Sequence, residues 1–576
     1  MKAEPVSAPS SYVPDSYGRN LYEVDPQFDA LLELYLPGEL FRHLRPHLVR
    51  LGGLAGGTLD ELAGTADRNP PDLRHRTRNG ADRQSVVKHP AYQELERFAY
   101  SEYGLAALSH RGGVLGWAEP MPPTAKYALT FLFVQAEFGL CCPVSMTDSL
   151  TRTLRKFGSP ALIARYLPAL TSQDMDALAQ GAMFMTEHGA GSDVGATATV
   201  AREAADGSWR LYGDKWFCSN PDAALAMVLA RPEGAVPGTR GLALFLLPRE
   251  LPDGSPNGYR ILRLKDKLGT RSMASGEIRL DGATAYLVGD LGRGFAQMTD
   301  MINNSRLSNG VRAAGLMRRA LNEALFVAGE RSAFGKRLIE LPLMQRQLAK
   351  MMVWTEQART MMFQTAAALG AADNGDATAR QLVRIRTPLI KFRACRDARK
   401  VAGDAMEVRG GSGYIEEWAE PRVLRDAHLG SIWEGTSNIV ALDVLRSIQK
   451  ADALAALAAQ WRRQLDEAAL APALRARFDA LLHGAAEFAR RTGVAPGDTF
   501  ARQAASGLYH GTTAAAMAWE AKRTGDARRL LLAQMVLSHR MAARDPLAAD
   551  ADPTPRLAEL LTERPMRDEA LAAALR

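Results

Sequence analysis

The sequence predicts an α+β fold, in which a sheet-forming unit lies between helical units and a further helical block follows. Apolar residues recur at helical spacing over residues 25–180, and the same periodicity returns after residue 295. The segments between are short, rich in aromatic and aliphatic residues, and bounded by Asp-Gly turns, which is typical of antiparallel strands. At 576 residues the chain is too long for one hydrophobic core, so several structural units are expected.

The first predicted unit, residues 1–180, starts with an arm rich in Pro, Ser and Tyr and continues as helices. Segments 26–36, 90–103 and 151–167 place apolar residues at helical spacing between Pro and Gly breaks. The stretch 52–82 is rich in Gly and Arg and is predicted to be a loop.

Residues 181–295 form the predicted antiparallel β unit, with strands expected near 208–217 and 241–247. Long helical segments then fill residues 296–450. The last block, 451–576, is rich in Ala, Leu and Arg and is also predicted to be helical. The predicted order is therefore helices, sheet, helices and an added helical block.

Composition and charge limit the class of protein without choosing its ligand. Hydrophobic residues make up 47% of the chain, as in ordinary globular proteins, and no apolar run reaches the length of a membrane span. The first residues lack a signal-peptide pattern and the four cysteines lack metal-site spacing, so we expect a cytoplasmic setting, no metal and no membrane partner. The net charge of +7 suits a phosphate-rich cofactor, a CoA ester or nucleic acid.

The segment 431–438, Ser-Ile-Trp-Glu-Gly-Thr-Ser-Asn, carries the strongest chemical signal. Its single carboxylate, Glu434, stands between an aromatic ring and a turn whose hydroxyls and amide can form hydrogen bonds. Gly435 lets backbone approach a flat ligand, because it has no Cβ. On its own the segment is more typical of a capped helix end, so its interpretation depends on the rest of the chain.

Four further segments suit a flat, phosphate-bearing cofactor. The stretch 183–194 offers small residues and hydroxyls, and 215–220 places aromatics before a serine. The segment 331–336 presents an Arg and a Phe on one helical face, suited to a pyrophosphate and an adenine ring, and 410–414 is a glycine-rich turn. Each has a structural alternative: a turn, a half-buried strand or a solvated arginine.

In their order and spacing these segments resemble the acyl-CoA dehydrogenase family, and the chain is identified as a member over about residues 85–448. The motifs TE-x-G-[AS]-GSD, KxWxxN, RxxFGK, GGxGY and [YW]EGT correspond to residues 186–194, 215–220, 331–336, 410–414 and 433–436. The resemblance implies an acyl-CoA dehydrogenase-like fold: an N-terminal helical domain, a central antiparallel β domain that resembles a barrel, and a C-terminal four-helix bundle.

Segments 69–73, 142–147 and 264–269 further resemble the AidB-like branch, flavoproteins of the adaptive response to DNA alkylation. That branch carries an extra helical C-terminal domain, which corresponds here to residues 451–576.

The resemblance also implies a reaction: a base removes the α-proton of a CoA thioester while the β-carbon passes a hydride to N5 of FAD. Glu434 corresponds to that base. Some members carry the base on an earlier helix just before an arginine, but Ser305 occupies that place here, before Arg306. The sequence therefore offers Glu434 no rival at that position.

The family pattern assigns eleven residues to FAD, around the flavin and its side chain, against the ring, and on the adenosine side. They are Met183, Met185, Thr186 and Ser192; Phe217 and Ser219; and Arg331, Phe334, Gly411, Thr436 and Asn438. Arg331 and Phe334 would reach the FAD of a neighbouring subunit, which implies a homo-oligomer, usually a tetramer in this family. An electron-transfer flavoprotein or oxygen would reoxidise the flavin. Three positions depart from the family pattern: His188 replaces a proline, Glu407 replaces a glutamine, and the expected Phe-Gln pair is displaced.

The last block leaves two functions open. Residues 451–576 contain 17 Lys and Arg against 15 Asp and Glu, with basic pairs at 462–463, 490–491, 522–523 and 528–529. Such pairs could meet the phosphates of duplex DNA, as the AidB-like resemblance implies, giving a DNA-associated flavoprotein with weak or vestigial dehydrogenase activity. The near-neutral charge favours the alternative of amphipathic helices that cover the core and support oligomerisation, because phosphate binding needs clustered positive charge.

Overall fold

The computed structural model describes residues 13–494, 497–543, 547 and 556–566. The chain divides into two compact units that are described separately. The sheet unit comprises residues 59–312 and 432–439, and the bundle unit comprises residues 1–58, 313–431 and 440–576. The predicted α+β fold is confirmed. Among the described residues, no helix is both long and apolar enough to cross a membrane.

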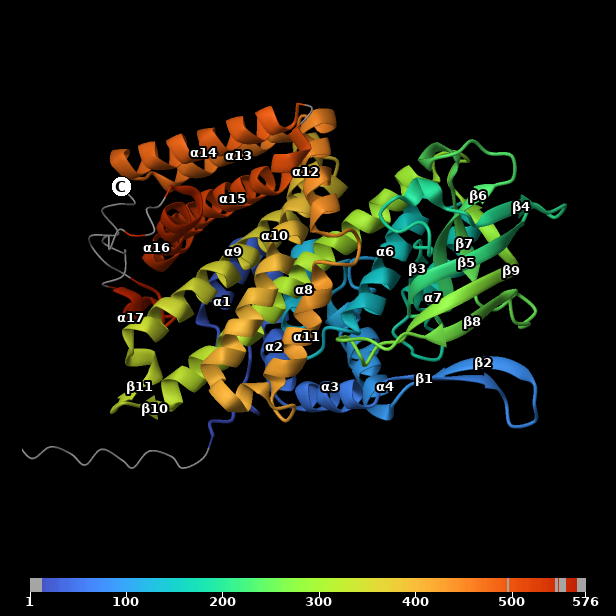
Figure 1. Cartoon of the computed structure of the whole chain (residues 1–576), viewed down its shortest axis with the longest axis horizontal. Coiled ribbons are helices and arrows are strands. Elements are labelled where there is room, and N and C mark those ends of the chain that lie inside the picture. The colour runs from blue at the N-terminus through green and yellow to red at the C-terminus, as the bar shows by residue number, and fades with distance from the viewer. Residues whose placement is uncertain (1–12, 495–496, 544–546, 548–555, 567–576) are drawn as a thin grey trace, which may run out of the picture. The chain divides into compact units, whose positions relative to one another are not determined.

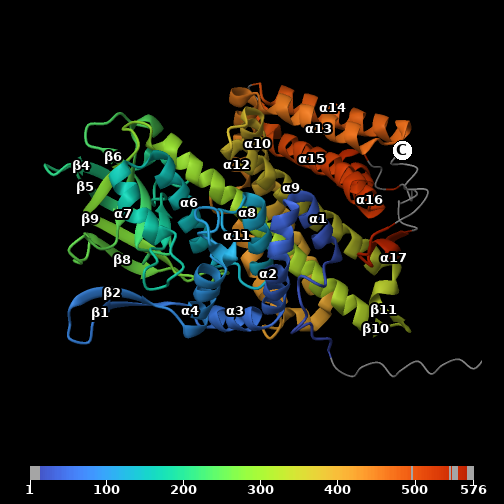
Figure 2. The ribbon, with the colours of Figure 1, turned by 180° about the vertical axis from the view of Figure 1, so that it is seen from behind.

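The sheet unit joins a seven-stranded sheet to a set of helices. Its helices are α3 (Thr58–Arg68), α4 (Pro90–Glu96), α5 (Pro123–Phe133), α6 (Cys141–Phe157), α7 (Pro160–Leu170) and the first part of α8 (Gly294–Glu330). Its main strands are β3 (Gly181–Phe184), β4 (Val200–Glu203), β5 (Trp209–Ser219), β6 (Leu225–Pro232), β7 (Ala243–Pro248), β8 (Tyr259–Leu264) and β9 (Ser275–Val288). Helix α6 packs against β3, and both views show the strands gathered into one body (Figures 1 and 2).

The sheet is barrel-like because its pairings close on themselves. The strand order is β3-β6-β4-β5-β9-β7, β8 adds to β9, and β7 also pairs with β6. Most ladders are antiparallel, as predicted, but β6 runs parallel to both β3 and β4. The expected strands near 208–217 and 241–247 correspond to β5 and β7.

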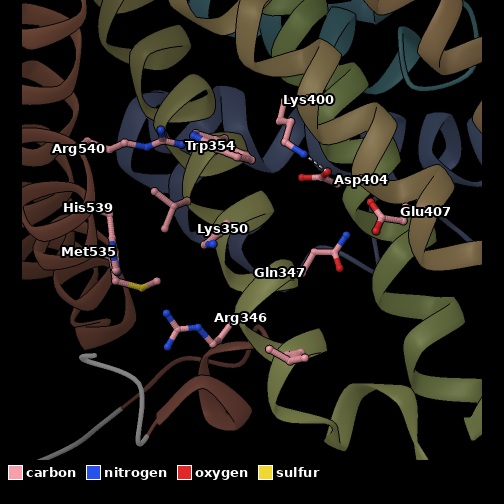
Figure 3. Close-up of a pocket in the computed structure, with 12 residues that line it drawn as sticks. Arg346, Gln347, Lys350, Trp354, Lys400, Asp404, Glu407, Met535, His539 and Arg540 are labelled. Atoms are coloured by element: carbon pink, nitrogen blue, oxygen red, sulfur yellow. Dashed lines mark hydrogen bonds and ion pairs between the residues drawn. The ribbon is translucent and has the colours of Figure 1, made fainter. Parts of the chain in front are cut away.

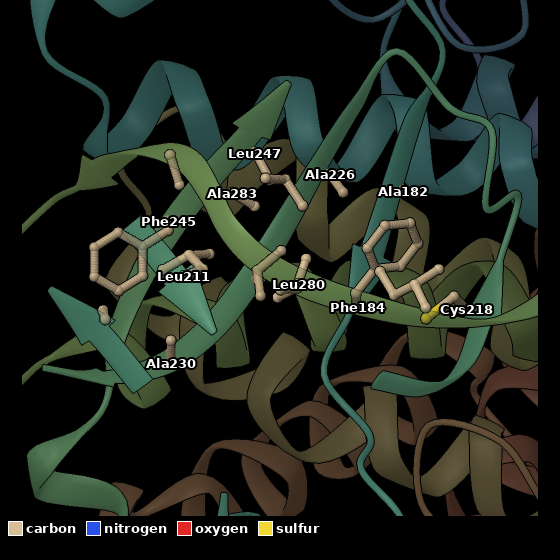
Figure 4. Packing of buried hydrophobic residues seen from close by; sticks show 14 of the residues in the cluster. Ala182, Phe184, Leu211, Cys218, Ala226, Ala230, Phe245, Leu247, Leu280 and Ala283 are labelled. Atoms are coloured by element: carbon tan, nitrogen blue, oxygen red, sulfur yellow. The ribbon is translucent and has the colours of Figure 1, made fainter. Parts of the chain in front are cut away.

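Alternating residues of these strands build the core of the sheet unit. Phe184, Leu211, Phe245 and Leu280 meet between the strands with little or no exposed surface, and small residues such as Ala182 fit between them (Figure 4). Such packing follows from the two-residue period of a strand, which sends every second side chain to the same face.

The loop predicted for residues 52–82 is wrong. Helix α3 lies within this stretch, and an exposed hairpin of β1 (Asp72–Arg76) and β2 (Asp82–Val87) follows. The hairpin strands are almost wholly polar and exposed, so they lack the alternating apolar residues by which a strand is recognised in sequence.

The bundle unit is built from long antiparallel helices. They are α1 (Pro26–Tyr35), α2 (Gly38–Gly56), the second part of α8, α9 (Pro342–Asp373), α10 (Ala377–Arg409), α11 (Ala419–Gly430) and α12 (Ser437–Ala451). A short hairpin, β10 (Ser332–Ala333) and β11 (Lys336–Arg337), precedes α9. The added block forms α13 (Ala453–Ala468), α14 (Pro472–Thr492), α15 (Ala501–Thr524), α16 (Ala527–Val536), a π-turn η8 (Leu537–Met541) and α17 (Leu557–Leu560). Helix α15 packs on both α9 and α10.

A buried ion cluster joins this block to the rest of the bundle unit. Its members are Asp25, Arg318, Glu356, Arg359, Glu520, Arg528, Arg529 and Glu563, all buried. Arg359 contacts Asp25 at 2.5 Å and Glu356 at 2.7 Å, and Arg529 Nη1 lies 2.9 Å from Glu356 Oε2. Although burial opposes ionisation, the surrounding guanidinium groups hold the pKa of Glu356 below its ordinary value.

The ion cluster corrects one expectation from the sequence. Arg528 and Arg529, predicted as a pair that could meet DNA phosphates, are buried and bound to Glu563, Glu520 and Glu356. They therefore stabilise the interior of the bundle unit. The other three predicted pairs, at 462–463, 490–491 and 522–523, are exposed.

Candidate active site

Glu434 lies in the sheet unit with an unusual backbone conformation. Its φ is +56°, a left-handed value that costs a non-glycine residue roughly 1–3 kcal/mol. Arg306 Nε donates to the Glu434 carbonyl oxygen at 3.0 Å, and the Ser305 hydroxyl donates to Oε1 of the carboxylate. The other oxygen, Oε2, is buried and accepts no hydrogen bond from the described residues. One oxygen is thus anchored and the other is available to react.

Aromatic rings and a buried cation form the wall beside Glu434. Trp433 stacks on Phe138 with ring centroids 5.9 Å apart, and the Arg312 guanidinium lies 4.8 Å from the Trp433 ring. The two terminal nitrogens of Arg312 are buried and have no hydrogen-bond partner among the described residues. A fixed positive charge at this depth favours negative charge nearby.

Helix α6 connects Glu434 to a second predicted segment. Burial raises the pKa of the Cys142 thiol, Arg312 lowers it, and Glu434 and Ser219 also act on it. The Ser219 hydroxyl, at the end of β5, lowers the pKa of the Cys142 thiol. The structure therefore brings Ser219 and Glu434 to the same thiol, although they are 215 positions apart in the sequence.

A polar cluster within the sheet unit holds α8 in register beside this site. Asn304, next to Ser305, donates to Asp148 Oδ2 at 2.8 Å. Asp148 also receives Lys126 Nζ at 2.9 Å and His110 Nε2 at 2.9 Å. Burial works against ionisation of Asp148, but Lys126 and His110 hold its pKa below the ordinary range.

The Gly-rich segment is fixed by one buried ion pair. Lys215 Nζ lies 2.7 Å from Glu187, which also accepts hydrogen bonds from Ala198 and Thr199. Burial opposes ionisation of Glu187, but Lys215 holds its pKa below the ordinary value. The Trp216 backbone N–H donates to the Thr186 carbonyl at 2.8 Å, so β5 and this segment run side by side.

Around this segment the predicted cofactor residues present accessible surface. Met183, Met185 and Thr186 are partly exposed, Ser192 is exposed, and the Phe217 ring is 59% exposed. A Cβ placed on Gly189 or Gly191 would meet no atom within 4 Å. Trp216 itself is half-buried in its strand, with Lys265 Nζ 3.4 Å from its ring centre.

These features fit a flat cofactor with a polar edge. Open glycine backbone, an exposed aromatic ring at Phe217 and hydroxyls at Thr186 and Ser219 suit an isoalloxazine, and Glu434 Oε2, which has no hydrogen-bond partner among the described residues, lies in the same unit. Thr436 and Asn438 follow Glu434 and are exposed at the start of α12.

Three predicted cofactor residues belong to the bundle unit. Arg331 Nη1 donates to the Arg409 carbonyl at 2.9 Å and lies beside Gly410, next to Gly411. Phe334 is 93% exposed at the tip of the β10–β11 hairpin. They form one corner of that unit, so their role toward a neighbouring subunit stays a prediction.

Four residues of the site were not assigned a role from the sequence: Ser305, Arg306, Cys142 and Arg312. The Ser-Arg pair at 305–306 was noted only for lacking a carboxylate. Cys142 opens the AidB-like segment 142–147, but that resemblance gives it no role at the site. No local pattern marks Arg312, which is an ordinary member of a helix.

Comparisons with known proteins match family models to most of the chain between residues 12 and 449. Family models match as the adaptive response protein AidB N-terminal domain over residues 12–177, the acyl-CoA dehydrogenase middle domain over 182–283 and the acyl-CoA dehydrogenase C-terminal domain over 292–449.

Curated relatives and a solved structure agree with these matches. The putative acyl-CoA dehydrogenase AidB of Escherichia coli is 36% identical, over 68% of this chain and 71% of the relative. Acyl-CoA dehydrogenase family member 11 of Caenorhabditis elegans is 33% identical, over 74% of this chain and 70% of the relative. The crystal structure of C. elegans ACDH-11 in complex with C11-CoA superposes with a TM-score of 0.84 at 27% identity, covering 94% of this chain and 95% of that one.

Proposed function

Because the chain belongs to the acyl-CoA dehydrogenase family and to its AidB-like branch, we propose that it dehydrogenates a CoA thioester between Cα and Cβ, with Glu434 as the α-proton base. FAD is the cofactor of this family and, when bound, supplies flavin N5 as hydride acceptor. Every other feature of the proposal concerns what the chain's own residues do.

The availability of Glu434 Oε2 carries the proposal. Ser305 and Arg306 hold the residue at Oε1 and at its carbonyl, so Oε2 is the oxygen that receives the proton. A positioned general base contributes about 10²–10⁴-fold to the rate. Met183, Met185, Thr186 and Ser192 would hold the flavin and its side chain, and Phe217 and Ser219 would lie against the ring.

The remaining assignments are part of the same proposal. Arg331, Phe334, Gly411, Thr436 and Asn438 would bind the adenosine side, with the first two reaching a neighbouring subunit of a homotetramer. The cytoplasm and reoxidation by an electron-transfer flavoprotein are proposed as well. All four cysteines are free and buried, which suits a reducing compartment.

The proposal is tested by anaerobic mixing of the FAD-loaded protein with short, branched, C11 and long-chain acyl-CoA esters. We expect loss of flavin absorbance with at least one ester and none with Glu434→Gln. Glu416→Gln, at an exposed carboxylate, is the matched control and should bleach normally. Flavin that stays oxidised with every ester would contradict the proposal, provided that each variant retains FAD.

A second candidate function rests on the AidB-like N-terminal domain and the added block: a DNA-associated flavoprotein with weak dehydrogenation. Exposed pairs at 462–463 and 522–523 would contribute the phosphate contacts. Binding of a labelled duplex should then fall steeply between about 50 and 200 mM salt. Affinity that is absent, or insensitive to salt, would exclude this candidate.

A further inference from the structure

A charged groove lies within the bundle unit, where α9 and α10 meet the added block. Helix α16 and the π-turn η8 form its third side, and its volume is about 550 Å³, which is within the range of small-molecule sites. Figure 3 shows side chains from all of these elements turned toward a common space. The groove exists only because the added block covers the bundle helices at this place.

Four cationic side chains line the groove. Arg346 and Lys350 are exposed and one turn apart on α9, so they share a face. Lys400 enters from α10, and Arg540 enters from η8 with its guanidinium 4.4 Å from the Trp354 ring centre. Burial lowers the pKa of Arg540, an effect that Asp397 only partly offsets, so an added anion would stabilise its charge.

The remaining lining separates into an apolar floor and an acidic end. Val353, Trp354 and Met535 are buried beneath the opening, and Leu343 stands exposed at its edge. Asp404 forms an ion pair with Lys400, one turn away on α10. Glu407 is exposed and lines the same groove, as Figure 3 shows.

We propose that this groove binds a nucleotide, with its phosphates against Arg346, Lys350 and Arg540 and its base over the apolar floor. Cations alone would suit any anion. An exposed carboxylate at the far end suits a ligand that also carries an N–H donor, and an exocyclic amine on a planar base supplies one. Glu407 accepts that hydrogen bond.

The three residues assigned to FAD in the bundle unit, Arg331, Phe334 and Gly411, do not line the groove. Glu407, which stands where the family pattern has a glutamine, lies at its acidic end, whereas the cationic residues and the apolar floor have no place in that pattern. The ligand of the groove therefore takes no part in the proposed dehydrogenation, and the inference goes beyond that function.

Calorimetric titration of the full-length, FAD-loaded protein with ATP, ADP, adenosine and pyrophosphate tests the site. We expect ATP and ADP to bind, and affinity to fall as salt rises. Arg346→Ala or Lys350→Ala should each weaken ATP binding at least about tenfold, because each removes a charge-assisted contact. Arg380→Ala, at an exposed arginine of α10 outside the groove, is the matched control and should leave it unchanged.

Three outcomes would overturn the inference. The first is no binding of ATP or ADP. The second is nucleotide binding that survives Arg346→Ala and Lys350→Ala but is lost with Arg331→Ala. That result would show that the nucleotide binds at the residues assigned to FAD and not in the groove. The third is pyrophosphate binding as tightly as ADP, which would exclude a base subsite. Flavin bleaching by acyl-CoA, followed in the same variants, should stay normal, so failure here is distinguishable from failure of the dehydrogenase proposal.

Discussion

At the scale of single residues, Glu434 combines a strained backbone with a carboxylate anchored at one oxygen. The left-handed φ is maintained by the Arg306 contact to its carbonyl, and Ser305 sets the direction of the side chain. Strain of this kind persists only where neighbouring contacts impose it, and it concentrates at functional sites. Ser305 is therefore a positioning residue for the proposed base.

Ser305→Ala should slow flavin bleaching about tenfold, because it removes a hydrogen bond to a charged group. Ser305→Thr, which keeps the hydroxyl, should restore the rate. Anaerobic stopped-flow measurements check this, with Ser308→Ala, one turn along α8, as control.

The charge of Asp148 makes the sheet unit sensitive to acid. Its lowered pKa means that the stabilisation is complete above the ordinary aspartate pKa of about 3.9 and is lost as pH falls toward the folded-state value. Asp148→Asn should lower the free energy of unfolding by about 3–5 kcal/mol at pH 7, because it leaves Lys126 buried and unpaired. Urea midpoints should show the gap between variant and wild type narrowing below about pH 4. A gap that is constant with pH would contradict this account.

At the scale of elements, the buried core of the sheet determines stability, whereas the exposed surface beside it is proposed to bind the cofactor. Phe245→Ala should lower the free energy of unfolding by about 3–5 kcal/mol, because it opens a cavity among fully buried side chains. Phe217→Ala removes a ring that is 59% exposed and should leave stability within about 0.5 kcal/mol while weakening FAD retention. Urea titration and flavin release on dilution measure the two effects. Equal losses of stability in Phe245→Ala and Phe217→Ala would contradict these separate roles.

Some elements and site residues could be predicted from the sequence, and others could not. Strands β5 and β7 were predictable because aromatic and aliphatic residues fill them, and Glu434 was identified through its motif. The polar β1–β2 hairpin and the parallel pairing of β6 were not, because neither leaves a periodic pattern. Ser305 and Cys142 join the site only through tertiary packing.

At the scale of the whole molecule, the buried ion cluster decides whether the added block stays docked on the bundle helices. Glu356 forms ion pairs with both Arg359 and Arg529. Glu356→Gln therefore removes one negative charge that both buried guanidinium groups share. We expect a loss of about 3–5 kcal/mol in the free energy of unfolding of the bundle unit. Limited proteolysis should then cut within residues 451–576, whereas Glu467→Gln, at an exposed position of α13, should leave the digestion unchanged.

The ion cluster also has a consequence for synthesis of the chain. Glu563, which binds Arg318 at 2.5 Å, leaves the ribosome more than five hundred residues after Asp25. Until then Arg318 and Arg528 lack one of their carboxylates, so the interior of the bundle unit carries excess positive charge. A nascent chain would therefore complete this cluster only after Glu563 has been synthesised, and a premature stop before residue 563 would yield a product prone to degradation by cellular proteases.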